Sequence, residues 1–354
     1  MTGGVSLAEA DGGDSAVPSL LDLDDPACRK EEVSGGKGAW LARGLAAGLP
    51  VLPGLVVTAA TSERAMAIGV DALARRGSGG ARLEVSAARL PPGLADEIAT
   101  RSAALADALV VRSSSLLEDS AEWAGAFTSY LDVAPNEVPR AVTGCWASAF
   151  NVSTLERHEA AGIAPGSKGM AVLLQPALNP EFGGTARLED GCVVITAVAG
   201  SPAPLLQGWE TGIEARVTSD GTVGGDGALA LMGETALLAV AEALEGAGRV
   251  GADQCEWAVV EGIVVLLQMM KSRRPQSEPV VALAGDALAG PQVADLARLV
   301  RRFPGPLGEA LVLPWAVGNP RLASIETEPL DMASAEALVA ARQHAAALTA
   351  EVWG

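Results

Sequence analysis

Hydrophobic positions between residues 37 and 163 alternate between the spacing of helices and the spacing of short buried strands. Helices are predicted over 37–47, 62–76, 94–106 and 139–161, and strands over 55–58 and 109–112. Ser62 is placed to cap its helix, and Gly48 and Gly77 are placed to end helices. The alternation predicts an α/β lobe over residues 30–165.

Residues 169–270 show a different pattern, dominated by short runs rich in β-branched residues. Strands are predicted over 170–174, 193–198, 214–218, 256–260 and 263–268, with one helix near 235–246. This pattern predicts an α+β lobe with a mostly antiparallel sheet over residues 166–275. Residues 1–29 are acidic and predict a loose leader, and residues 280–354, after a linker at 271–279, predict a mostly helical extension.

Composition narrows the function classes. Apolar residues make up 49% of the 354 residues and charged residues 19%, a globular composition. The net charge is −18, and no Lys/Arg run is longer than Arg273-Arg274, so nucleic acid is not an expected partner. Four scattered cysteines predict free thiols in a reducing compartment. No apolar run reaches 18 residues, so we expect a cytoplasmic protein without a membrane partner.

The most informative segment is residues 33–58, VSGGKGAWLARGLAAGLPVLPGLVVT, which places Lys37 among Gly35, Gly36 and Gly38. Glycines let the backbone approach a ligand closely, and the ammonium group can bind an anion. The spacing is not that of a Walker loop. Taken alone, such a turn is more often an ordinary surface turn than a binding site.

The whole segment resembles the opening of a nucleotide-binding domain. That domain is shared by phosphoenolpyruvate synthase, pyruvate phosphate dikinase and rifampicin phosphotransferase, and reads GGKG/N-A-x-L, a helix, then GLPVPPGFVVT. The matching residues are Gly35 to Ala39, Leu41, Gly48 to Val51, Pro53-Gly54 and Val56 to Thr58. The resemblance covers about residues 30–275. It implies a two-lobed ATP-grasp-like fold, α/β and α+β, that clamps ATP between its lobes, followed by the helical C-terminal extension.

A second resemblance places an arginine at the tip of a strand. Residues 110–133, VVRSSSLLEDSAEWAGAFTSYLDV, resemble the family signature VRSSAxxEDxxxxSFAGqxxTxLnV. An arginine there can form a forked contact with phosphate oxygens, and serine hydroxyls add donors. The alternative is an arginine paired with Glu118 or Asp119. The resemblance implies that Lys37 and Arg112 are the catalytic phosphate ligands, with Gly36 and Ser113 beside them.

Two further resemblances imply the adenine and metal contacts. Residues 170–178, MAVLLQPAL, resemble the family strand VVVQxMV that ends beside adenine, which implies roles for Gln175, Ala177 and Leu178. Residues 253–270 resemble QDIEWAxxxGxLxLLQARP, in which the glutamate and the glutamine bind metal. These correspond to Glu256 and Gln268, whose oxygens suit Mg²⁺.

The geometry of this predicted hairpin gives a check on the metal hypothesis. A two-residue turn at Glu261-Gly262 pairs residue 256 with residue 267 and sends 268 to the opposite face. A three-residue loop over 260–262 puts 256 and 268 on one face. The metal hypothesis therefore predicts the three-residue loop, and an ordinary amphipathic hairpin does not require it.

The chain departs from the family pattern mainly in its second lobe. Gln254 replaces an aspartate, Met270 replaces a phosphate-binding arginine, and Ser153 stands where an arginine is usual. Ser201-Pro202-Ala203 replaces a GLGE turn, and the SGVxFTRDPxTG loop is reduced to residues 182–187. Loss of an acid and an arginine weakens stabilisation of transition-state charge.

Histidine content bears on the phosphate acceptor. Only His158 and His344 are present, both expected on the surface, and the TGGxxSHAAI motif of the family's phosphohistidine domain is absent. The leading hypothesis is therefore an ATP- and Mg²⁺-binding phosphotransferase subunit. It would phosphorylate a histidine of a separate partner protein and leave AMP and phosphate. The alternatives are a kinase for an unidentified small molecule and a catalytically eroded pseudoenzyme that scaffolds or regulates a partner.

Overall fold

The computed structural model describes residues 17–119, 123 and 125–271. The predicted helical extension at 280–354, His344 and most of the predicted leader lie outside these residues. Both sheets described below belong to one compact unit.

The first sheet has five strands, and every pairing within it is antiparallel. Its order is β1 (Leu20–Asp22), β2 (Leu55–Val57), β5 (Met170–Pro176), β3 (Leu109–Ser115) and β4 (Ser129–Val133). The prediction grouped the strand at 170–174 with the second lobe, but β5 is the central strand of the first sheet. Strand β1 lies within the segment predicted as a loose leader.

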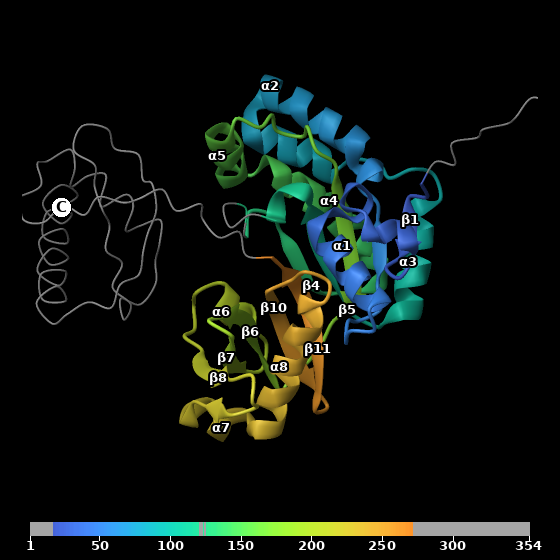
Figure 1. The fold of residues 1–354 in the computed structure, drawn as a ribbon. Coiled ribbons are helices and arrows are strands. Elements are labelled where there is room, and N and C mark those ends of the chain that lie inside the picture. The colour runs from blue at the N-terminus through green and yellow to red at the C-terminus, as the bar shows by residue number, and fades with distance from the viewer. Residues whose placement is uncertain (1–16, 120–122, 124, 272–354) are drawn as a thin grey trace, which may run out of the picture. The chain divides into compact units, whose positions relative to one another are not determined.

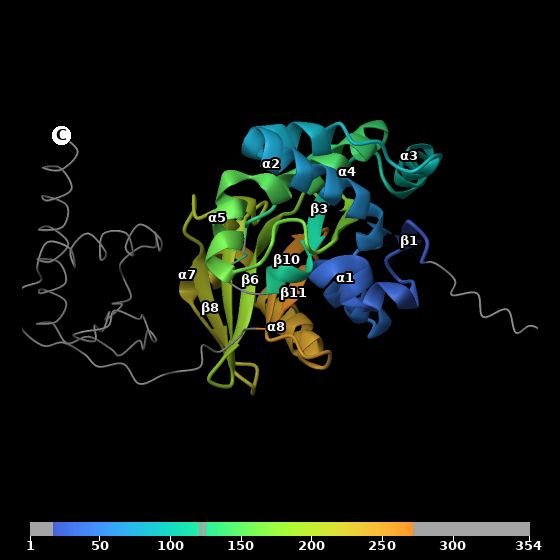
Figure 2. The ribbon, with the colours of Figure 1, turned by 90° about the horizontal axis from the view of Figure 1, so that it is seen from above.

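Helices cover both faces of this sheet (Figures 1 and 2). Helix α1 (Glu31–Ala46) packs on one face, where Leu41 and Ala42 share a core with Leu173 of β5. On the other face lies a second core, which draws residues from α2 (Glu63–Ser86), α3 (Leu94–Leu105) and α4 (Val138–Ala147). Strand β3 is therefore buried between two helical layers.

Three predicted helices differ from those observed. The helix predicted over 37–47 begins earlier, at Glu31, with a break at Gly35. The helix predicted to end at Gly77 continues as α2 to Ser86, with a break at Gly77, where φ is 69°. The helix predicted over 139–161 is divided. Helix α4 ends at Ala147, a 3-10 turn covers Ser148–Phe150, and α5 (Val152–Ala161) begins after Asn151, whose backbone is extended. The Ser62 hydroxyl does not cap α2; it accepts a hydrogen bond from the Met170 N–H at 2.9 Å and donates to the Ala59 carbonyl at 2.7 Å.

The second sheet has six strands and is antiparallel throughout, as predicted. Its order is β11 (Ile263–Met270), β10 (Gln254–Val260), β6 (Phe182–Glu189), β7 (Cys192–Ala199), β8 (Ile213–Val217) and β9 (Val223–Gly224). Helices α7 (Asp226–Met232) and α8 (Glu234–Gly248) pack against one face of this sheet (Figure 1), and the short helix α6 (Ala203–Leu206) follows β7.

The two lobes meet along β11. Val51 pairs in parallel with Leu266, and the Leu266 N–H donates to the Pro50 carbonyl at 2.7 Å. Gly44 of α1 lies against Met269, where a Cβ atom would overlap the methionine methyl group. One hydrophobic core consequently runs from α1 to the α8 face of the second sheet.

No helix within the described residues is by itself long and apolar enough to cross a membrane. Helices α7 and α8 meet the length and composition criteria only as a pair bent by 100°.

His158 is buried, contrary to the prediction of a surface residue. Its ring packs edge-on against Trp123, with ring centroids 4.7 Å apart, and the side chain of nearby Thr154 donates to the Ala126 carbonyl at 2.9 Å. No hydrogen-bond partner for Nδ1 of His158 is found in the described part of the chain. Trp123, which is distant in sequence, covers this face of α5.

This burial predicts acid sensitivity. Desolvation lowers the pKa of His158, so the folded state favours the neutral ring. The stability it contributes is fully present above the ordinary histidine pKa of about 6.5 and is lost as the pH falls below that value. We expect His158→Phe to flatten the decline in the free energy of unfolding between pH 7 and pH 5. Equal declines in both proteins, measured by denaturant titration, would contradict this assignment.

Candidate functional site

The glycine-rich turn is packed against β3 rather than lying on the surface. Gly35 interrupts α1 with φ of 68°, and a Cβ atom at this residue would overlap the Ser114 carbonyl. The Gly38 N–H donates to Ser114 Oγ at 3.0 Å, and Ser114 Oγ donates to the Ser34 carbonyl at 2.6 Å. Only glycine combines this conformation with this approach, so the turn fixes where Lys37 lies, and Gly36 is buried beside it.

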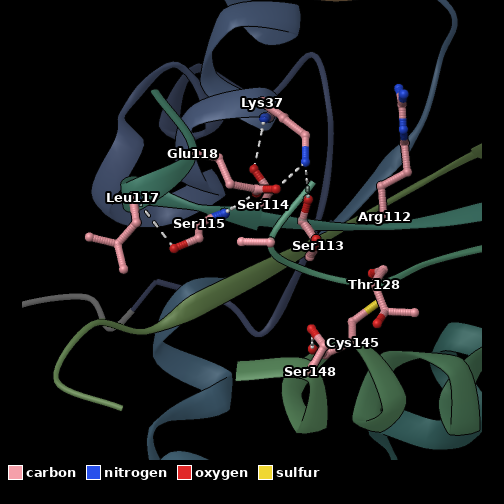
Figure 3. Close-up of polar contacts among 12 residues, drawn as sticks. Lys37, Arg112, Ser113, Ser114, Ser115, Leu117, Glu118, Thr128, Cys145 and Ser148 are labelled. Atoms are coloured by element: carbon pink, nitrogen blue, oxygen red, sulfur yellow. Dashed lines mark hydrogen bonds and ion pairs between the residues drawn. The ribbon is translucent and has the colours of Figure 1, made fainter. Parts of the chain in front are cut away.

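Lys37 reaches the end of β3 and meets a buried carboxylate (Figure 3). Its Nζ donates to the Ser113 carbonyl at 3.3 Å and forms an ion pair with Glu118 Oε1. Glu118 Oε2 accepts from the Ser115 N–H at 3.0 Å. The side chains of Lys37 and Glu118 are 15% and 3% exposed, so this pair is largely removed from water. Sequence reasoning considered Glu118 only as a partner for Arg112.

Arg112 lies on the same side of β3 as Lys37 and extends away from it (Figure 3). Its Nη1 donates to the Leu267 carbonyl at 2.6 Å, and its Nη2 lies 3.4 Å from Glu256 Oε2. The Arg112 side chain is 17% exposed and that of Glu256 is 15% exposed. Arg112 therefore links β3 of the first sheet to both strands of the β10–β11 hairpin.

Ser113 faces away from this site. Because side chains alternate along a strand, its hydroxyl lies on the opposite face from Arg112, toward Cys145 (Figure 3). It is fully buried and has no hydrogen-bond partner within the described residues. The expectation that the Ser113 hydroxyl donates to phosphate is therefore corrected, and only the Ser113 carbonyl takes part, through Lys37.

The hairpin turn differs from the prediction, but Glu256 and Gln268 still lie on one face of the sheet, as predicted. Val260 pairs with Ile263, so the turn has two residues, Glu261 and Gly262, both with positive φ, and the predicted three-residue loop is wrong. The register shifts further along, where Trp257 pairs with Leu266 but Glu256 pairs with Gln268. Leu267 is the extra residue of a β-bulge. The bulge places Glu256 and Gln268 side by side and leaves the Leu267 carbonyl to accept from Arg112.

The donor chemistry of this hairpin fits Mg²⁺ that is shared with a ligand. Nowhere in the described ranges do three His, Cys, Asp or Glu residues gather as a metal centre. Glu256 and Gln268 offer one carboxylate and one amide oxygen. Mg²⁺ commonly accepts so few protein oxygens when phosphates and water supply its other ligands. These two residues would hold such an ion.

The predicted adenine contacts already have partners within the protein. Gln175 is buried, and its Nε2 donates to the Leu52 carbonyl at 3.1 Å. The Ala177 N–H donates to the Ala108 carbonyl at 2.9 Å. Gln175 pairs with Val110, two residues before Arg112 on β3. The roles of Gln175, Ala177 and Leu178 toward adenine remain predictions.

The departures of the second lobe form a coherent local structure. Residues 182–187, which the sequence indicated only as a shortened loop, lie in strand β6. A Cβ atom at Gly183 would crowd Pro202, so the two altered segments pack together. Gln254 pairs with Met270 on one side and Arg187 on the other. Arg187 is paired with Glu189 at 3.1 Å and Glu214 at 3.7 Å.

Two other features do not belong to this site. A groove of about 400 Å³ between β1, β2 and α3, beside the Arg101–Asp22 ion pair, includes none of the predicted site residues. All four cysteines are free. Burial raises the pKa of Cys28 and Cys255 to about 12, so neither offers a thiolate nucleophile.

Comparison with known proteins identifies one family, and 24 chains of solved structures also match. Residues 31–222 match the AMP/ATP-binding domain of pyruvate phosphate dikinase. No curated protein matches the chain. Among solved structures, the dinucleotide forming acetyl-coenzyme A synthetase 1 of Ca. Korarchaeum cryptofilum, in complex with coenzyme A, Ca-AMPCP and HgCl+, is 11% identical. That match covers 52% of this chain and 84% of the other. Its TM-score is 0.28, which is too low to establish structural similarity.

Proposed function

The chain belongs to the family of pyruvate phosphate dikinase AMP/ATP-binding domains, and from this we propose that it binds Mg-ATP and transfers phosphate to a partner. Its fold is ATP-grasp-like and its family binds ATP. The transfer step, the acceptor and the bound Mg²⁺ are our proposal.

One observation supports the proposal most strongly. Lys37 bonds to the carbonyl of Ser113, the residue that follows Arg112, so two cations from distant segments lie at the same stretch of β3. Arg112 in turn contacts Glu256, the proposed metal ligand of the second lobe. Two cations at β3, one of which contacts an oxygen-rich hairpin, match the needs of a triphosphate with its metal.

Each cation keeps capacity for a phosphate. An ammonium group has three N–H donors, and Lys37 uses two of them on Ser113 and Glu118. A guanidinium has five, and Arg112 makes contacts through Nη1 and Nη2. Mg²⁺, when bound, would neutralise phosphate charge. Lys37 and Arg112 would orient the phosphates and stabilise the charge that develops on them.

We place the phosphate acceptor on a separate protein. In the described part of the chain the sole histidine, His158, is buried against Trp123 and unsuited to exchange phosphate with a partner. The family pattern then gives AMP and phosphate as products. Free cysteines agree with action in the reducing cytoplasm.

A second candidate function rests on specific contacts. Glu118 and Glu256 already pair with the two cations, and Gln254 and Met270 replace charged family residues. The two cations are thus already paired with carboxylates, and two charged groups of the family pattern are missing. Both observations agree with a pseudoenzyme that binds nucleotide without transferring phosphate.

The test follows the nucleotide products. The protein is incubated with Mg-ATP, with and without a candidate partner that carries a TGGxxSHAAI segment, and AMP and ADP are quantified by chromatography. We expect AMP and acid-labile phosphate on the partner only when its histidine is intact. ATP binding without AMP would favour the pseudoenzyme, and ADP formed with a small molecule would favour the kinase alternative.

A further inference from the structure

The second sheet carries a line of oxygen-bearing side chains that crosses five strands. Because the register aligns them directly opposite one another, each strand contributes one residue. We call this line the polar row. It consists of Gln268, Glu256, Thr185, Thr196 and Glu214.

The polar row lies on the face turned away from α8. The residues that alternate with it, including Trp257, Ile195 and Ala215, are buried in the core that α8 shares. The polar row itself is not fully buried, since Glu214 is exposed and Thr185 and Thr196 are half-buried. It therefore borders the space reached by Arg112, which contacts Glu256 from the first lobe.

Thr185 stands out within the polar row because it flanks Glu256. Glu256 pairs with Gln268 on β11 and with Thr185 on β6, so oxygens lie on both sides of the carboxylate. Directly opposite residues have Cβ atoms about 4.5–5.5 Å apart, which lets three such side chains converge on one ion. The Thr185 hydroxyl makes no hydrogen bond within the described ranges. Arg112 contacts Glu256 through Oε2, which leaves Oε1 for another partner.

We propose that Thr185 is a third protein ligand of the divalent cation, beside Glu256 and Gln268. This inference rests on the proposed function, because it concerns the cation that accompanies ATP. A hydroxyl is a hard oxygen donor suited to Mg²⁺ or Mn²⁺. It supplies an oxygen in a lobe where Gln254 stands in place of a family aspartate. The set carries one negative charge, so the cation binds with the nucleotide phosphates and not alone.

The test measures how much a metal strengthens nucleotide binding. The dissociation constant of a non-hydrolysable ATP analogue is determined by calorimetry with Mn²⁺ and with EDTA, and the ratio of the two values is compared between proteins. Thr185→Val should reduce this metal-dependent ratio about tenfold, the lower end of the loss typical of weakened metal sites. Binding in EDTA should not change. Thr185→Ser, which keeps the hydroxyl, should retain the wild-type ratio.

Thr196→Val is the matched control, since Thr196 lies next in the polar row but is not opposite Glu256. An unchanged ratio in Thr185→Val, or an equal fall in Thr196→Val, overturns the role of Thr185 while leaving ATP binding intact. A wild-type protein that binds no analogue under either condition overturns the proposed function together with this inference.

Discussion

Lys37→Ala is expected to lower the free energy of unfolding by about 3–5 kcal/mol, because it leaves the buried Glu118 carboxylate without its cation. Glu118 is 3% exposed and is held in place by the Ser115 N–H, so it cannot turn to water. The loss would appear in urea titrations without any nucleotide. The residue predicted from the sequence as a phosphate ligand thus also has a large structural role.

Two variants separate the buried charge from other effects of truncation. The double variant Lys37→Met with Glu118→Gln removes both charges and keeps an acceptor for Ser115, so most of the stability should return. Arg76→Ala breaks an exposed ion pair with Glu84, in which Arg76 is 57% exposed, and should cost no more than about 1 kcal/mol. A loss for Lys37→Ala no larger than for Arg76→Ala would contradict the buried pair.

Arg112→Met is expected to weaken ATP binding about ten- to 150-fold. A hydrogen bond to a charged group contributes about 1.5–3 kcal/mol, and every 1.4 kcal/mol is about tenfold in affinity. The same change removes the 2.6 Å contact to the Leu267 carbonyl, which ties β3 to the second lobe. Arg112→Lys keeps the charge but cannot hold two partners as a fork, so it should recover only part of the affinity.

Calorimetric titration with ATP and Mg²⁺ measures this effect. Arg187→Met is a suitable control, because Arg187 lies on the second sheet and pairs with Glu189 and Glu214. Its loss should leave ATP affinity within about twofold. Equal weakening by both variants would mean that general charge, and not the position of Arg112, determines binding.

The glycine-rich turn around Lys37 and the strand that carries Arg112 could be predicted from short segments of the sequence. The glycines around Lys37 were recognisable because Gly35 must adopt a positive φ and pack against Ser114, and such constraints leave a short motif. The strand before Arg112 was recognisable from its apolar run. Family resemblance then supplied the role of each cation.

Other features depend on contacts between distant segments. Glu118 pairs with Lys37 across 81 positions, and the Trp123 ring buries His158. The pairing of β5 with β2 and β3 places that strand in the first sheet, which its apolar sequence alone does not indicate. Residues 182–189 form a strand despite Gly183-Gly184, because neighbouring strands β10 and β7 supply partners on both sides.

For the hairpin, the predicted loop length was wrong, but the predicted alignment of Glu256 with Gln268 is observed. The turn residues Glu261 and Gly262 favour a two-residue loop, which would have separated Glu256 from Gln268. The bulge at Leu267 restores their alignment. The carbonyl of Leu267 accepts from Arg112, a tertiary contact that no local pattern in the hairpin reveals.

The central claim is that Lys37 and Arg112 bind the phosphates of one nucleotide between the two lobes. Its most direct test compares the affinities of wild-type protein and Arg112→Met for Mg-ATP and for adenosine, which has no phosphate. We predict that Arg112→Met weakens ATP binding at least tenfold, as argued above, and leaves adenosine binding unchanged. Equal effects on both ligands, or no effect on ATP, would contradict the claim.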